Sequence, residues 1–136
     1  MEKTLVLIKP DGVKRNLIGE IISFYERKNL KIIGIKMLEA NIHTVEEHYI
    51  EHEGRVYYKD LINYLTEGPI VAMVVQGENA IKAVRKINGC TDPLEADMGS
   101  IRGRYALAKQ RNLVHSSDSE ISAQREVNLW FPEMIV

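Results

Sequence analysis

The chain has 136 residues, of which 45% are hydrophobic and 27% are charged, and its formal net charge is −1 at pH 7. This length fits one domain with a substantial core and leaves little room for a second, so we expect a single domain over residues 1–136. The composition is that of an ordinary globular protein, which argues against a disordered chain or a membrane protein. The near-zero net charge gives no global basic field of the kind that a general nucleic-acid binder shows.

Two features of the sequence predict a cytoplasmic location. The first apolar run, Leu5–Ile8, is short and lacks a preceding basic region, so we expect neither a signal peptide nor a membrane span. The single cysteine, Cys90, cannot form an intramolecular disulfide, which agrees with a reducing compartment.

The first third of the chain predicts a strand, a helix and a second strand. Residues 3–9 are rich in leucine and β-branched residues and end at the turn signal Pro10-Asp11-Gly12, which is typical of a buried strand. Asn16 offers an N-cap for a helix whose apolar residues recur at helical spacing over 17–25. Residues 31–39 alternate in the period of two that is typical of a half-buried strand.

A pair of short helices is predicted next. Thr44 and Glu47 have the spacing of a capping box and open a helix that carries two histidines, His48 and His52. Histidines at i and i+4 could in principle bind a metal, but no third ligand lies nearby and we expect no metal site there. A second short helix follows Tyr57-Tyr58, whose rings are either packing residues or, at the lip of a cleft, a surface on which a base can stack.

The second half of the chain predicts two more strands and two more helices. Residues 70–75 are apolar throughout, as in a central strand that is covered on both faces. Asn79 caps a helix that closes at Asn88-Gly89. Residues 90–103 show no sustained period, and a loop of this length is more often functional than accidental. Residues 113–115 predict a last strand, and a last helix begins at 117–119.

This order predicts an α+β fold of the ferredoxin-like βαββαβ type, with a helical hairpin inserted between the second and third strands. We expect an antiparallel sheet with helices packed on one face. Such a fold also hosts RNA-binding and regulatory domains, so it implies no particular chemistry.

The most suggestive stretch for function is 112–119, which sets His115 at the end of an apolar strand and just before a polar turn. A scaffold of this kind can present a reactive side chain, although a lone histidine is more often structural. Between 102 and 111 the chain carries four cations and no acidic residue, which indicates either an anionic ligand near His115 or a solvated basic edge. These cations are Arg102, Arg104, Lys109 and Arg111.

Two motifs at opposite ends of the chain resemble the signatures of nucleoside diphosphate kinases. They are Lys9-Pro10-Asp11-Gly12 after the first strand and Asn112-x-x-His115-x-Ser117-Asp118 near the end. Further matching segments lie between them in the family's order, so the resemblance covers essentially the whole chain and is more specific than any single motif. These segments are His48-Tyr49-Ile50, Gly68-Pro69, Ala83-Val84-Arg85, Thr91-Asp92-Pro93 and Ser100-Ile101-Arg102-Gly103.

The resemblance implies a ping-pong reaction in which Nδ1 of His115 takes the γ-phosphate of a nucleoside triphosphate, usually ATP, and passes it to a nucleoside diphosphate. A neutral imidazole is a good nucleophile, and an ordinary pKa near 6.5 leaves much of it neutral at pH 7. The resemblance also implies Mg²⁺ held by the nucleotide phosphates rather than by protein ligands, and a homo-oligomer, either tetramer or hexamer. It gives no reason to expect a membrane or sequence-specific nucleic acid as a partner.

The same resemblance implies roles for particular side chains. Ser117 and Glu126 would orient the imidazole, and a ring at Tyr57 would stack on the nucleobase with broad base specificity. Asn112, together with Lys9, would bind the ribose 3′-hydroxyl. The phosphates would be surrounded by cations and hydroxyls, the groups that phosphoryl transfer needs. These are Lys9, Tyr49, Arg85, Thr91 and Arg102, with His52 in some members.

Three positions depart from the family's pattern. Ser116 stands where Gly or Ala is common, Arg104 where Asp is common, and Lys109 where an apolar residue is often found. We expect activity to survive the Ser116 change, although the turn after His115 can differ, whereas Arg104 and Lys109 both add positive charge.

The sequence leaves one other class of function open and excludes a second. A binding module of the same fold, such as a nucleotide sensor or a nucleic-acid binder, would bind nucleotide without forming a phosphoenzyme. A P-loop or protein-kinase-like phosphotransferase is excluded, because the chain has neither Gly-x-x-x-x-Gly-Lys-Ser/Thr nor a Gly-rich loop with His-Arg-Asp.

Overall fold

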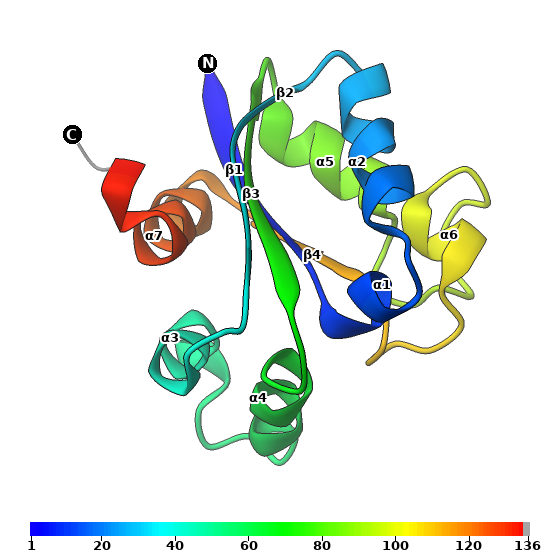
Figure 1. Cartoon of the computed structure of the whole chain (residues 1–136). Coiled ribbons are helices and arrows are strands. Elements are labelled where there is room, and N and C mark those ends of the chain that lie inside the picture. The colour runs from blue at the N-terminus through cyan, green and yellow to red at the C-terminus, as the bar shows by residue number, and fades with distance from the viewer. Residues whose placement is uncertain (135–136) are drawn as a thin grey trace.

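A single antiparallel sheet organises the protein, whose computed structural model describes residues 1–134. Within these residues, β1 pairs with both β3 and β4, and β2 pairs with the outer side of β3, so that the order is β2-β3-β1-β4 (Figure 1). The strands are β1 (Glu2–Ile8), β2 (Lys31–Leu38), β3 (Ile70–Gly77) and β4 (Val114–Ser116).

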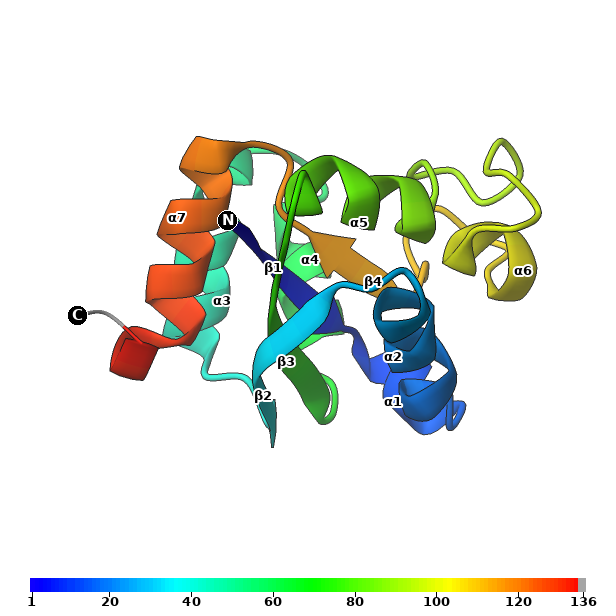
Figure 2. The same cartoon turned by 90° about the horizontal axis from the view of Figure 1, so that it is seen from above.

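Helices form a layer on each side of this sheet (Figure 2). The α-helices are α1 (Pro10–Lys14), α2 (Ile18–Arg27), α3 (Ile42–His48), α4 (Tyr58–Leu65), α5 (Ala80–Asn88), α6 (Ile101–Tyr105) and α7 (Glu120–Trp130), and the 3-10 helices are η1 (Ile50–His52) and η2 (Pro132–Met134). The expected βαββαβ order with a helical hairpin between the second and third strands is confirmed. No helix among residues 1–134 is long and apolar enough to cross a membrane.

The two layers explain why β1 and β3 are apolar at nearly every position. Val6 and Met73 point to the layer that contains α2 and α5, whereas Leu7 and Val74 point to the layer that contains α3, α4 and α7. Strands covered on both faces lose the alternation of polar and apolar residues. The two helices of the βαββαβ core, α2 and α5, lie on one face as expected, and the inserted hairpin and α7 add a layer on the other.

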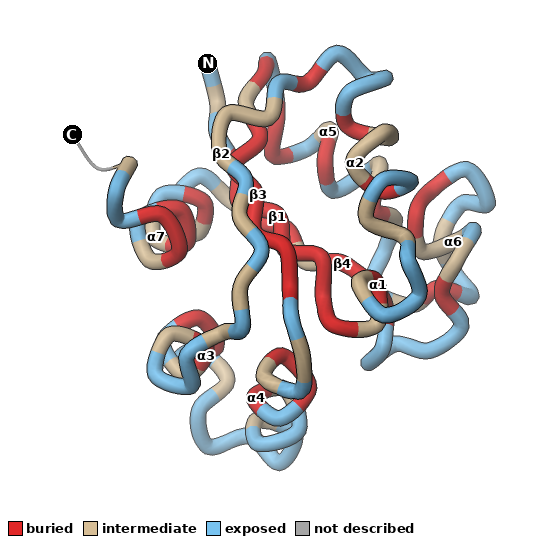
Figure 3. The backbone as a smooth tube through the Cα atoms, in the orientation of Figure 1, coloured by how far each residue is buried: buried red, intermediate tan, exposed pale blue. Residues whose placement is uncertain are grey.

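The edge strand β2 is more exposed than its neighbours (Figure 3). A register shift between Ile32 and Gly34 interrupts its pairing with β3. Ile35 and Met37, which alternate along the strand, are 54% and 58% exposed. The strand itself is confirmed, but its apolar alternation faces outward at these two positions.

Two predicted helix starts were wrong. The α3 helix begins at Ile42, because the Asn41 side chain caps it by accepting a hydrogen bond from the N–H of His43 at 2.8 Å. An earlier cap satisfies the first free amides, so the Thr44 box lies inside the helix. Asn16 is also no cap, since it adopts φ 60° between two separate helices, and α2 begins at Ile18. By contrast, Ser119 caps α7 through the N–H of Ser122.

Candidate active site

A cleft of about 820 Å³ lies where β1 and β4 meet the segments that carry α3, α4, α5 and α6. Its wall brings together residues that are more than one hundred positions apart in the chain. Of the side chains expected at the site, Ser117 is the exception that does not line the wall, and the others are Lys9, Tyr49, His52, Tyr57, Arg85, Thr91, Arg102, Asn112, His115 and Glu126.

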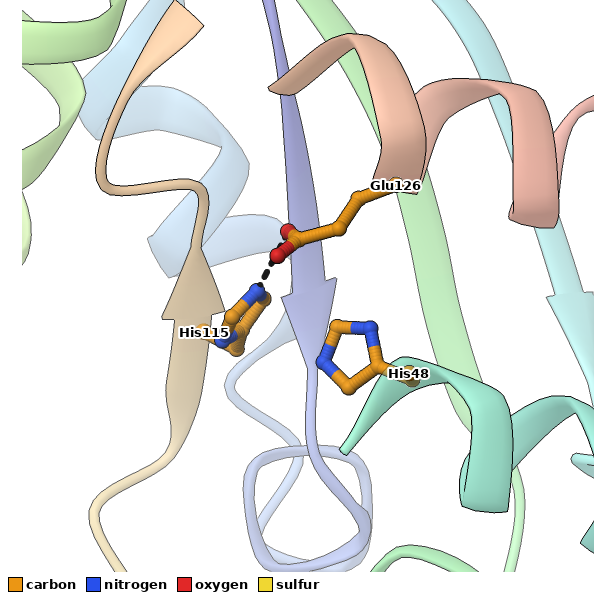
Figure 4. A group of neighbouring side chains, drawn as sticks. All are labelled: His48, His115 and Glu126. Atoms are coloured by element: carbon orange, nitrogen blue, oxygen red, sulfur yellow. Dashed lines mark hydrogen bonds and ion pairs between the residues drawn. The ribbon is translucent and has the colours of Figure 1, made fainter. Parts of the chain in front are cut away.

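His115 lies in β4 opposite Leu7 of β1, and its ring meets the C-terminal helix (Figure 4). Its Nε2 is 2.8 Å from Oε1 of Glu126 on α7. The hydroxyl of Ser117 donates to the same carboxylate oxygen at 2.9 Å. A carboxylate oxygen is an acceptor, so Nε2 carries the proton and Nδ1 carries the lone pair. Among residues 1–134, Nδ1 has no hydrogen-bond partner.

Burial and the neighbouring cations keep the ring of His115 neutral. Burial lowers the pKa of His115 to about 3, and the nearby cations Lys9, Arg102 and Arg85 act in the same direction. A neutral imidazole keeps the Nδ1 lone pair that a nucleophile needs. Burial raises the pKa of Glu126, and the hydrogen bond from Ser117 opposes this shift by favouring the ionised carboxylate.

Lys9 is buried at the end of β1, where it is 8% exposed. Its ammonium donates to Oδ1 of Asn112 at 2.9 Å, and the Asn112 amide donates to the carbonyl of Thr91 at 3.2 Å. Burial lowers the pKa of Lys9 to about 8, with Arg102 acting in the same direction and Asp11 opposing it. The ammonium is therefore mostly charged at neutral pH and only weakly solvated.

The guanidinium of Arg102 is fixed by three backbone carbonyls. It donates to the carbonyls of Gly89 at 2.7 Å, Asn112 at 3.3 Å and Val114 at 2.6 Å. Gly89 follows α5, whereas Asn112 and Val114 lie just before and within β4, so the side chain ties the end of α5 to the strand that carries His115. Arg85, in the last turn of α5, adds a second guanidinium to the wall.

The Pro10-Asp11-Gly12 turn braces the backbone immediately before His115. Leu113 adopts a φ of 77°, which is uncommon outside glycine and costs conformational energy. The Asp11 carboxylate accepts a hydrogen bond from the Leu113 N–H at 3.2 Å, while the Lys9 N–H donates to the Leu113 carbonyl at 2.8 Å. The Tyr64 hydroxyl donates to the other oxygen of Asp11. Sequence reasoning treated Asp11 only as a turn residue and missed this role.

At the outer rim, His52 and Tyr57 face each other. Nδ1 of His52 lies 2.8 Å from the Tyr57 hydroxyl, and the Tyr57 ring is 40% exposed. Tyr49 lies deeper, where burial raises its pKa and keeps its hydroxyl protonated.

A family model described as nucleoside diphosphate kinase matches residues 2–136. The chain belongs to the nucleoside diphosphate kinase family. Nucleoside diphosphate kinases are phosphotransferases, and the chain is an enzyme of this class.

Individual relatives agree with this assignment over nearly the whole length. The nucleoside diphosphate kinase of Sulfurisphaera tokodaii is 53% identical over 98% of this chain and 90% of its own length. That of Staphylococcus epidermidis is 55% identical over 96% of this chain and 88% of its own.

Solved structures support the fold as well. A nucleoside diphosphate kinase family protein from Babesia bovis has a TM-score of 0.96 and 43% identity, and the match covers 100% of this chain and 93% of that one. The halophilic nucleoside diphosphate kinase of Halobacterium salinarum, in complex with CDP, has a TM-score of 0.93 and 42% identity, over 96% of this chain and 87% of that one.

The departures from the nucleoside diphosphate kinase pattern have separate structural settings. Ser116 is one of the residues that line the cleft, but its hydroxyl lies on the side of the sheet that faces α2 and α5 and accepts a hydrogen bond from the Asn88 amide at 3.1 Å. Lys109 lines the cleft and forms an ion pair with Asp92 at 4.0 Å. Arg104 is not part of the cleft wall, and its guanidinium lies 5.7 Å from the centre of the Phe24 ring.

The two histidines at i and i+4, His48 and His52, lie apart in the structure. His52 is at the rim beside Tyr57, whereas His48 is buried between Trp130 and His115. Sequence reasoning gave His48 no role in the site, although His48-Tyr49-Ile50 is one of the segments that resemble the family. The structure nevertheless places its ring 4.5 Å from that of His115, measured between centroids.

Proposed function

We propose that the chain transfers the γ-phosphate of a nucleoside triphosphate to a nucleoside diphosphate through a phosphohistidine at Nδ1 of His115. The observation that carries this proposal is the 2.8 Å contact between Nε2 and Glu126, because it leaves the lone pair on Nδ1 in a cleft lined with cations. The whole chain would act as one domain, which is supported by a single sheet that contributes to both core clusters.

In the first half-reaction the Nδ1 lone pair attacks the γ-phosphorus. The bond from that phosphorus to the bridging β-phosphate oxygen breaks, and the nucleoside diphosphate leaves with the electron pair. The ring then carries a positive charge, which Glu126 stabilises through the hydrogen bond from Nε2, with Ser117 holding the carboxylate. In the second half-reaction a terminal phosphate oxygen of another nucleoside diphosphate attacks the phosphorus on His115. The bond between Nδ1 and phosphorus then breaks, and its electron pair returns to Nδ1. Proton transfer is not required in either step.

The chain's own contribution to catalysis is placement and charge neutralisation, which dominate phosphoryl transfer. Lys9, Arg85 and Arg102 would bind phosphate oxygens, and the hydroxyls of Tyr49 and Thr91 would add donors. Support comes from the preset position of the Arg102 guanidinium and the buried, weakly solvated ammonium of Lys9. Groups held in advance need little reorganisation when negative charge moves during transfer.

The outer part of the cleft would hold the nucleoside. The exposed ring of Tyr57 would stack on the base, and stacking accepts any base because each has a π face. Asn112, with Lys9, would bind the ribose 3′-hydroxyl, and His52 would approach the phosphates. The CDP in the complex of the Halobacterium salinarum relative is a nucleoside diphosphate, which suits a pocket of this kind.

The side chains of the cleft suit a Mg²⁺ ion that arrives with the nucleotide. Of the acidic groups in the wall, Glu126 accepts from His115 and Ser117, and Glu67 forms a two-point ion pair with Arg111. The other acidic residues of the wall, Glu51, Asp60 and Asp118, are exposed to water. Magnesium retains water readily and is commonly held by phosphates. When bound to the nucleotide phosphates it would supply further charge neutralisation, and we propose no protein ligand for it.

A homo-oligomer, tetramer or hexamer, and a cytoplasmic location complete the proposal. Exposed Ile35 and Met37 on the edge strand β2 support assembly, because an edge strand with apolar side chains is a ready surface for pairing. Light scattering coupled to gel filtration measures the assembly, and a monomer at micromolar concentration would contradict it.

The decisive test is formation of a phosphoenzyme. Incubation with γ-labelled ATP and Mg²⁺ should label the protein in an acid-labile, alkali-stable bond, and a labelled enzyme freed of nucleotide should pass the label to any nucleoside diphosphate. The His115→Asn variant should bind nucleotide and take no label. Nucleotide binding by the native chain without any label would instead support a binding module of the same fold.

A further inference from the structure

His48 is a buried side chain beside the nucleophile that the proposed reaction does not use. It is the last residue of α3 and is 4% exposed. Its Nδ1 accepts a hydrogen bond from the indole N–H of Trp130 at 3.1 Å. Its Nε2 is buried and has no hydrogen-bond partner among residues 1–134. A buried polar atom without a partner is costly, so this nitrogen calls for an explanation.

The free edge of the His48 ring is turned toward His115. The two ring planes are inclined at 77° with their centroids 4.5 Å apart, which is an edge-to-face arrangement. In Figure 4 one ring nitrogen of His48 lies on the side of the ring that faces His115. Since Nδ1 is taken by Trp130, this nitrogen is Nε2.

The Trp130 contact also fixes which nitrogen of His48 carries the proton. An indole N–H can only donate, so Nδ1 must present a lone pair. Burial lowers the pKa of His48 well below 6.5, and His115, Arg125 and Lys9 add to this effect while Glu126 opposes it. The ring is therefore neutral, and its one proton lies on Nε2.

A metal ion is the obvious alternative for this cluster. One nitrogen or oxygen from each of His48, His115 and Glu126 lies within 4.8 Å of the others. Binding through Nε2 of His48 would move its proton to Nδ1, where it would face the Trp130 N–H. Metal-bound histidines normally donate through their second nitrogen to an acceptor, and Trp130 offers a donor instead. The surroundings of His48 therefore oppose a metal site.

We propose that His48 is a positioning residue, held by Trp130 in its Nε2–H form so that this N–H meets the face of the His115 ring. Contacts of this kind between an N–H and a ring are weak but directional. This one keeps the His115 ring from turning about its side-chain bond, so that Nε2 stays on Glu126 and Nδ1 stays available to the cleft. The inference rests on the proposed role of His115 as the nucleophile.

The Trp130→Phe variant tests the idea with little change in packing, because it retains an aromatic ring and removes only the donor. Long-range ¹H–¹⁵N spectra report which nitrogen of each histidine carries the proton. In the native chain the protons of both His48 and His115 should lie on Nε2. In the variant His48 should become a mixture of both forms, and the single form of His115 should be partly lost.

The kinetic signature should be a change in kcat without a change in KM. Single-turnover phosphorylation should slow by about fivefold in Trp130→Phe, the size expected for a weak directional contact. His48→Phe should slow it at least as much, whereas His48→Gln, whose amide can accept from Trp130 and donate to His115, should restore most of the rate. In a His48→Phe background, Trp130→Phe should add no further loss, since Trp130 acts through His48.

The outcomes separate this inference from the proposed function. A native chain that forms no phosphoenzyme would refute the proposed function, whatever the histidine spectra show. A native chain that forms phosphoenzyme with the His48 proton on Nδ1 would overturn the positioning role. An unchanged His115 spectrum together with an unchanged rate in Trp130→Phe would overturn it too. The spectra of the native chain decide the matter even where a variant fails to fold.

Discussion

Nε2 of His115 and Oε1 of Glu126 lie 2.8 Å apart, although one residue belongs to β4 and the other to α7. The contact links the strand that presents the nucleophile to the helix that covers its face of the sheet. It fixes the form of the imidazole, because the carboxylate accepts the Nε2 proton and leaves Nδ1 free. The orientation of the reactive group is therefore a property of the tertiary fold.

Glu126→Gln should slow phosphoenzyme formation by about 10²-fold, because an amide can donate to Nε2 as well as accept from it, and it carries no charge to stabilise the phosphorylated ring. Single-turnover labelling with γ-labelled ATP measures this rate. Nucleotide affinity should change little, since Glu126 bonds the ring and Ser117. A rate within twofold of native would show that the carboxylate does not orient His115.

The neutral ring of His115 predicts activity under mildly acidic conditions. An imidazole with an ordinary pKa near 6.5 would be ~97% protonated at pH 5. Burial and the neighbouring cations hold the pKa of His115 far below this range, so the ring should stay unprotonated at that pH. A titration of its ring signals by NMR should show no transition between pH 8 and pH 5, and a midpoint near 6.5 would contradict the expectation.

The same shift should make the fold less stable in acid. The unfolded chain protonates His115 below about pH 6.5 while the folded chain does not, so the free energy of unfolding falls as pH drops. The contribution approaches about 1.4 kcal/mol per pH unit for one group. Denaturant unfolding of the native chain and of His115→Asn at pH 7 and pH 5 tests this, and the variant should lose less stability over the interval. Equal losses would show that His115 titrates alike in both states.

The lowered pKa of Lys9 predicts that kcat/KM falls at alkaline pH. Burial lowers its pKa to about 8, so the free enzyme keeps this cation below that pH and loses it above. The value of kcat/KM should therefore fall as pH rises through about 8. Tyr49 does not explain such a fall, because its own pKa is raised.

Lys9→Arg provides the matched control for this fall of kcat/KM at alkaline pH. Arginine stays protonated over the whole range, so the variant should be slower at neutral pH but its kcat/KM should no longer fall between pH 8 and pH 10. An alkaline limb that persists unchanged in the variant would assign it to another group.

The sequence predicted the elements and the motifs because their signals are local. The apolar run of β3, the turn at 10–12 and the helix end at Gly89 each depend on residues within a few positions. Where two local signals competed, as at Asn41 and Thr44, periodicity alone did not decide between them. The exposure of Ile35 on the edge strand also depends on which elements cover that part of the sheet, and a local sequence pattern does not contain this information.

The parts of the site that sequence reasoning missed are contacts between distant segments. Asp11 braces Leu113 across 102 positions, and Trp130 holds His48 across 82. From the local sequence, Asp11 is explained as a turn residue, Trp130 as a core aromatic residue and His48 as a histidine on a helix. Only the packing of α7 and α3 against one face of the sheet brings the second pair beside His115.

Ser116 tests whether the residue after the nucleophile serves the fold or the chemistry. Its hydroxyl accepts from the Asn88 amide at 3.1 Å, and Asn88 accepts from the Tyr25 hydroxyl at 2.5 Å, so a buried chain of hydrogen bonds joins α2, α5 and β4. Ser116→Ala should leave one Asn88 N–H unpaired and lower the free energy of unfolding by about 1–3 kcal/mol. The phosphorylation rate should stay within about twofold of native, because the hydroxyl faces away from His115.

An Asn88→Ala background supplies the control, since Ser116→Ala should cost little stability once the amide is gone. Denaturant unfolding of the four chains gives the coupling between the two side chains, and single-turnover labelling gives the rates. If Ser116→Ala slowed phosphorylation tenfold with unfolding unchanged, the hydroxyl would act on the cleft side of the sheet. The serine would then be part of the phosphate site instead of a link between two helices and the strand.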